Sequence, residues 1–112
     1  FERCNSLTDL DVSNFNTDKV ESMAFMFQNC SSLSSLNLSN FDTSNVVDMS
    51  SMFSGCRSLR TLNMQNAVFN ATNYSYMFNG SSGLTITVKD EVARSWIQDK
   101  LGSNGTAVIG SI

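Results

Sequence analysis

The feature that most constrains this chain is a repeat with a period of 26 residues. Cys4, Cys30 and Cys56 follow one another at that interval. When the sequence is laid out with this period, other positions fall into columns of one residue type: Phe1, Phe27 and Phe53; Leu7, Leu33 and Leu59; Leu10, Leu36 and Leu62; and Asn14, Asn40 and Asn66. So many matched columns do not arise by chance, and they indicate a stack of similar structural units.

Each copy begins with a segment typical of a short β-strand. Residues 33–40 read L-x-x-L-x-L, then a small residue and Asn, which is the strand signature of leucine-rich repeats. By the alternation of a strand, Leu36 and Leu38 point inward, whereas Ser35, Asn37 and Ser39 lie on the outer face. The polar run that follows, residues 42–45, predicts a turn at the end of the strand.

The second half of each copy has apolar residues at three- and four-residue spacing. Val46, Met49, Met52 and Phe53 would lie on one face of about two turns of α-helix or 3₁₀-helix. We therefore predict short helical turns on the side opposite the strands. The methionines with this spacing are expected in the core rather than on a binding surface: Met23, Met26, Met49 and Met52. Phe27 and Phe41 are also expected to be buried, because they lie among apolar columns in successive copies.

The last copy departs from the pattern, as terminal repeats do. Ala67 stands where Phe41 would be, Tyr74 replaces Met49, and Ser81 replaces the cysteine. The alternation from Leu84 to Val88 still predicts a final strand.

A different pattern follows this strand. Asp90 can cap a helix that extends to about Leu101 and is ended by Gly102. Its apolar stripe would consist of Val92, Ala93, Trp96, Ile97 and Leu101, and residues 107–109 would form one more extended piece. The predicted fold is an α/β repeat: a leucine-rich-repeat solenoid over residues 1–88, with parallel strands on one face, and a C-terminal helix-plus-strand cap over residues 89–112.

Charge and hydropathy exclude several classes of partner. The net charge is -3, and the few Lys and Arg residues are scattered along the chain, which argues against nucleic acid and anionic membranes. The apolar runs are far shorter than the roughly 20 residues that cross a bilayer. Because Phe1 falls in the middle of a repeat, we expect preceding sequence, which would carry any export signal.

From Leu33 to Cys56 the chain reads L-x-x-L-x-L-S-N-F-D-T-S-N-V-x-x-M-x-x-M-F-x-x-C. This pattern resembles the BspA-type leucine-rich-repeat surface proteins of bacteria. The resemblance implies an extracellular, cell-surface-attached protein with a role in adhesion. Its partners would be surface or matrix proteins of a host or of a neighbouring cell. The resemblance brings no catalytic residue and no cofactor.

Enzymatic and metal sites are not expected. The chain has no histidine, and one thiol per repeat does not gather four ligands around a zinc ion. Neighbouring strands lie about 4.8 Å apart, within reach of a disulfide, but parallel side chains rarely attain the required torsion. We therefore expect Cys4, Cys30 and Cys56 to form a column of reduced, buried thiols. Asp9 and Asp11 could bind calcium, although solvated surface carboxylates are the favoured interpretation.

The outward strand positions remain as the candidate site. Three polar columns would lie side by side and offer hydrogen-bonding groups at fixed spacing to an extended partner. The predicted partner-binding residues are Asp9, Asp11, Ser13, Ser35, Asn37, Ser39, Thr61, Asn63 and Gln65, with Thr85, Thr87 and Lys89 continuing the columns. Three alternatives stay open: a face that is merely soluble, a passive stalk that spaces another domain from the cell surface, and a carbohydrate-binding module. A glycan binder would need exposed aromatic residues, and these columns contain none.

Overall fold

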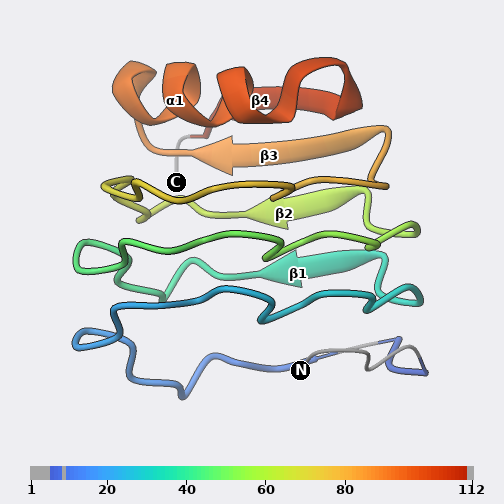
Figure 1. Ribbon diagram of the computed structural model, residues 1–112, viewed down its shortest axis with the longest axis horizontal. Coiled ribbons are helices and arrows are strands. Elements are labelled where there is room, and N and C mark those ends of the chain that lie inside the picture. Colours follow the sequence, from blue (N-terminus) through green and yellow to red (C-terminus); the bar gives the residue numbers. More distant parts are fainter. Residues whose placement is uncertain (1–5, 9, 111–112) are drawn as a thin grey trace.

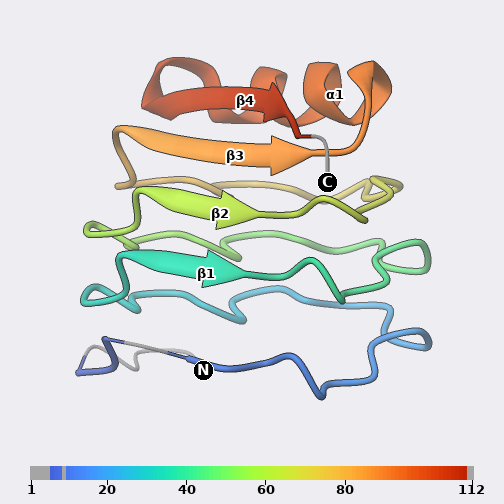
Figure 2. The ribbon, with the colours of Figure 1, turned by 180° about the vertical axis from the view of Figure 1, so that it is seen from behind.

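Four parallel strands form the one sheet in the computed structural model, which describes residues 6–8 and 10–110. The strands neighbour one another in chain order and are β1 (Ser35–Asn37), β2 (Thr61–Asn63), β3 (Leu84–Val88) and β4 (Gly105–Ile109). Helix α1 (Glu91–Leu101) and the short 3₁₀-helix η1 (Gly102–Asn104) connect β3 to β4. Figures 1 and 2 show the windings of the chain stacked one above another, with the strands along one side.

The strands pair in the direction that the sequence predicts. Ser35 pairs with Thr61, one repeat period further along the chain, and Thr61 pairs with Thr85. The inward leucines are also in register, with Leu36 beside Leu62. Each strand is therefore joined to the next by a long return segment, as parallel pairing requires.

The return segments are not helical, so the prediction of short helical turns was wrong. Residues 24–29, 50–55 and 75–80 form overlapping turns, and the structure assigns no helix anywhere from residue 10 to residue 90. Some N–H groups close four-residue turns, as from Met26 to the carbonyl of Met23 at 3.2 Å. The alternate N–H groups donate to the next winding: Met23 to Asp48, Phe25 to Ser50, Phe27 to Met52 and Asn29 to Ser54, at 2.7–3.0 Å. An α-helix would use those donors within its own segment.

The turns need left-handed backbone at regular positions. Gly55 has a φ of 75° and Gly80 has a φ of 85° at the third residue of their turns, where type II turns place a residue with positive φ. In the preceding winding Asn29 adopts the same conformation, with a φ of 60°. A Cβ atom on Gly55 would lie 2.0 Å from Oδ1 of Asn29, so both the conformation and the close packing require glycine there.

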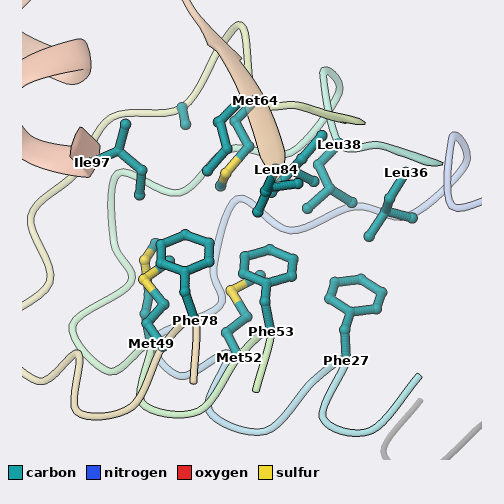
Figure 3. Close-up of a cluster of buried hydrophobic side chains, with 14 of the residues drawn as sticks. Phe27, Leu36, Leu38, Met49, Met52, Phe53, Met64, Phe78, Leu84 and Ile97 are labelled. Atoms are coloured by element: carbon teal, nitrogen blue, oxygen red, sulfur yellow. The ribbon is translucent and has the colours of Figure 1, made fainter. Parts of the chain in front are cut away.

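Stacked aromatic rings fill the space between the sheet and the turns (Figure 3). The Phe27 and Phe53 rings are 5.7 Å apart and nearly parallel, and Phe53 and Phe78 are 5.6 Å apart in the same arrangement. The predicted burial of Phe27 and Phe41 is confirmed, with exposed fractions of 0% and 1%. The predicted core methionines Met23, Met49 and Met52 are buried, and Met26 is half-buried against them.

Polar columns of the repeat bind neighbouring windings together. Nδ2 of Asn40 donates to the carbonyls of Val12 and Ser13 in the preceding winding, at 3.1 and 3.0 Å. The buried hydroxyl of Thr43 donates to the carbonyl of Val68 at 2.8 Å and accepts from its N–H at 2.9 Å. These bonds explain why Asn and Thr recur at the repeat period.

The predicted helix is present as α1, and Asp90 is its N-cap, since its Oδ1 accepts from the N–H of Ala93 at 2.9 Å. The buried residues of α1 are Ala93, Ile97 and Leu101. Val92 is 81% exposed, so its assignment to the apolar stripe was wrong. The strand predicted at residues 107–109 begins earlier, at Gly105, and extends the sheet as β4.

The thiols of Cys30 and Cys56 are buried and not disulfide-bonded, as predicted; Cys4 lies outside the described residues. Sγ of Cys56 donates to the carbonyl of Phe27 at 3.0 Å. In the next winding, Oγ of Ser81 donates to the carbonyl of Phe53 at 3.2 Å. Burial, followed by the proximity of Cys30, raises the pKa of Cys56 to about 12.

Replacing Phe27 with Ala should lower the free energy of unfolding by about 3 to 5 kcal/mol, because the change empties a fully buried ring site in the stack. Phe25→Ala is the matched control, since that ring is 45% exposed two residues away and its removal should cost less than about 1 kcal/mol. Urea denaturation of both variants measures the difference. Equal losses would show that the stacked ring contributes no more than an exposed one.

Cys56→Ser should flatten the alkaline loss of stability. The thiol pKa rises from 9.0 to about 12 on folding, so its contribution is fully present below pH 9 and is lost as the pH rises towards 12. Serine keeps a donor for the Phe27 carbonyl, as Ser81 does for Phe53, but does not ionise in this range. Denaturation at a series of pH values from 8 to 11 compares the two proteins. If the free energy of unfolding fell equally with pH in both proteins, the result would contradict a raised pKa of Cys56 in the folded state.

Candidate functional site

The outward positions of the sheet lie where strand alternation predicts them. Ser35, Thr61 and Thr85 are exposed and in register across three strands. The inward residues Leu36 and Leu62 between the outward columns are buried. Since no side-chain hydrogen bond occupies this first column among the described residues, its hydroxyl groups are available to a partner.

A shallow hollow of about 220 Å³ lies over these strands. It is lined by Ser35, Leu36, Asn37, Thr61, Leu62, Asn63, Thr85 and Thr87. Apart from Leu36 and Leu62, the residues that line it have short polar side chains.

The second predicted column has a structural role that the sequence analysis missed. Oδ1 of Asn37 accepts from the N–H of Ser39 at 2.9 Å, and Oδ1 of Asn63 accepts from the N–H of Gln65 at 3.0 Å. These side chains close turns at the ends of the strands. Only their amide nitrogens, for which the described residues provide no partner, remain to face solvent.

Asp11 repeats this arrangement in the first winding. Its Oδ1 accepts from the N–H of Ser13 at 2.9 Å. Hydrogen bonds from Ser13, through its side chain and then its backbone, lower the pKa of Asp11. The carboxylate is therefore held in its charged form by a local turn.

The third predicted column also takes part in structural hydrogen bonds, through the side chain of Gln65 and the backbone carbonyls of Ser13 and Ser39. Nε2 of Gln65 donates to the carbonyl of Gly110 at 3.2 Å, so this side chain fastens the C-terminal segment. The carbonyl of Ser39 accepts from the amide of Asn66, and the carbonyl of Ser13 accepts from that of Asn40. Asp9 lies outside the described residues.

Neither metal-binding clusters nor spanning helices occur in the described ranges. No group of three or more Cys, Asp or Glu side chains within residues 6–8 and 10–110 could hold a metal ion. Over the same residues, no helix has both the length and the apolar character needed to cross a membrane.

An aromatic cluster at the C-terminal end went unpredicted. The Phe69 and Trp96 rings stack at 4.7 Å, and the Tyr74 ring meets Trp96 edge-on at 5.7 Å. Nζ of Lys100 lies 4.3 Å from the centre of the Tyr74 ring, within cation–π range. Tyr74 is 40% exposed, whereas Met49, at the corresponding position of the preceding copy, is fully buried.

A second hollow, of about 460 Å³, adjoins this cluster. Its polar and aromatic lining includes Tyr74, Tyr76, Asn79, Asp99, Lys100 and Asn104. Tyr76 is 73% exposed and occupies a left-handed turn position, with a φ of 59°. Phe25, Ser51 and Tyr76 occupy corresponding positions in successive repeats, which was the only sequence feature that could have drawn attention to Tyr76. Because these segments were predicted to be helical, that feature did not predict which of the three side chains are exposed.

No curated protein and no solved structure matches this chain. One family model matches residues 1–97, and it is described as a Mycoplasma protein of unknown function, DUF285. The match covers the stacked windings and most of α1. The chain therefore belongs to the DUF285 family, a repeat family associated with surface proteins.

Proposed function

We propose that this chain is a segment of a BspA-type leucine-rich-repeat solenoid and acts as a non-enzymatic adhesion or protein-binding module on the bacterial surface. The association of its family with surface proteins supports the extracellular location. The parallel strands, paired one repeat period apart from β1 to β2, support a solenoid architecture.

The observation that carries the proposed site is the exposed column of Ser35, Thr61 and Thr85. The core does not use these side chains, and the described residues offer them no hydrogen-bond partner. The amide nitrogens of Asn37 and Asn63 lie beside them in the next column. An extended segment of a surface or matrix protein lying across the strands would meet hydroxyl and amide groups at strand spacing.

Two other functions make different demands on the same molecule. A passive stalk needs no free polar column. A carbohydrate-binding module would use exposed aromatic rings, and Tyr74 and Tyr76 beside Asp99 and Lys100 provide them at the C-terminal hollow rather than on the sheet. An adhesion module would therefore bind through the strands, a carbohydrate-binding module would bind through the tyrosines, and a stalk would have no binding residues.

The double variant Ser35→Lys and Thr85→Lys should abolish adhesion without unfolding the chain. The two strands are not adjacent, so the new charges avoid direct cross-strand repulsion. They place cationic side chains where a partner needs short polar contacts. Adhesion to a panel of immobilised matrix and cell-surface proteins measures binding, and a circular dichroism melt checks folding.

The matched control is Val47→Lys with Thr72→Lys, which adds the same charge at exposed positions beside the bridged residues Asp48 and Asn73, outside the sheet. This control should bind as the parent does. Equal adhesion by both double variants would exclude the strand face and favour the stalk. Glycan binding that survives the strand variant but disappears in Tyr76→Ala would favour the carbohydrate module.

A further inference from the structure

The side chain of Gln98 closes part of the outer edge of the sheet. Its Oε1 accepts from the N–H of Ala107 at 2.8 Å, and its Nε2 donates to the carbonyl of Gly105 at 3.2 Å. Both backbone groups belong to β4, which pairs with β3 on its other side. Gln98 itself lies on α1, one turn before the helix ends.

This pair of bonds has the pattern of a further parallel strand. In a parallel ladder, one residue of a strand bonds through its N–H and its carbonyl to two groups that flank a single partner residue. Gly105 and Ala107 flank Thr106 in this way. The primary amide of Gln98 thus makes the two contacts that the N–H and carbonyl of one residue in a fifth strand would make.

The edge behind Gln98 would otherwise be suited to pairing. β4 is an outer strand of five residues, and Val108 and Ile109 are 38% and 51% exposed on it. An exposed strand with unpaired N–H and carbonyl groups is a template for another chain, and proteins commonly cover such edges. A stack of parallel strands is especially open to this, because each new winding repeats the previous one.

We propose that Gln98 is the residue that terminates the sheet, and that it prevents β4 from pairing with a strand of a second copy of this chain. The family match ends at residue 97, so Gln98 and β4 lie outside the matched repeat region. The termination device therefore belongs to the segment that follows the repeats. In this segment a side-chain amide makes the hydrogen bonds to the edge of the sheet that the backbone of the next strand makes within the repeats.

The test uses the 112-residue chain with Gln98→Leu, which keeps a side chain of similar size and removes both hydrogen bonds to β4 together with a third, from Nε2 to the carbonyl of Gly102. Sedimentation velocity over a concentration series should show reversible association of this variant, while the parent chain remains unchanged. Ser95→Leu is the control, because it adds the same apolar group at an exposed position of α1. The control should sediment as the parent does.

A second substitution establishes where association occurs. Adding Val108→Lys to Gln98→Leu places a charge on β4 and should restore the parent's sedimentation, since edge lysines oppose strand pairing. Association that persists in this double variant, an equal response of Ser95→Leu, or a Gln98→Leu variant that stays folded and unassociated would each overturn the proposal.

Amide hydrogen exchange of the parent chain keeps the proposal testable if Gln98→Leu fails to fold. The N–H of Ala107 points away from β3, yet its bond to Gln98 should make it exchange as slowly as the amides paired within the sheet. Exchange of Ala107 at the rate of an unprotected amide would show that Gln98 leaves the edge open.

Discussion

The structure depends on hydrogen bonds that leave each winding for the next. On the turn side, alternate N–H groups from Met23 to Asn29 donate to carbonyls of the following winding, and Met49 to Gly55 do the same one winding later. The strands repeat this on the opposite side. A single winding would leave these donors and acceptors without partners, which is costly for buried backbone. Stability therefore comes from stacking, and the columns of Phe, Met, Thr and Asn residues record that requirement.

The same requirement limits which surface residues can evolve for binding. Asn37 and Asn63 are outward-facing, yet their side-chain oxygens end the strands, and Gln65 holds the C-terminal segment. When the repeats are aligned, every outward residue of the sheet looks available for binding. In the part of the chain that the structure describes, some of these side chains instead make hydrogen bonds that hold the fold, and others make none. Among the described residues, Ser35, Thr61 and Thr85 form a column that is exposed, in register and without such a task, which makes it the sharper site for our proposed function.

Sequence columns predicted the parallel register, the buried phenylalanines and the helix capped by Asp90, because these depend on period, alternation and local capping. They failed on the return segments, since a three- and four-residue spacing of Val46, Met49 and Met52 fits both a helix and a chain of turns. A helix and a chain of turns differ in which carbonyl groups accept from the backbone N–H groups. In this chain the acceptors lie in the next winding, so the sequence of a single repeat does not reveal them. Tyr76 and Gln98 escaped prediction for a related reason: their roles depend on left-handed backbone and on an edge created by distant residues.

The most direct test of this account is the stability of Thr43→Val, which preserves shape and burial but leaves the backbone N–H and carbonyl of Val68 without their partner in the neighbouring winding. Each unsatisfied group should cost about 1 to 3 kcal/mol. Thr85→Val, at an exposed strand position, should change stability by no more than about 0.5 kcal/mol. Urea denaturation of both variants should therefore show a large loss for Thr43→Val alone. Equal stability of the two variants would contradict the claim that bonds between windings hold the fold together.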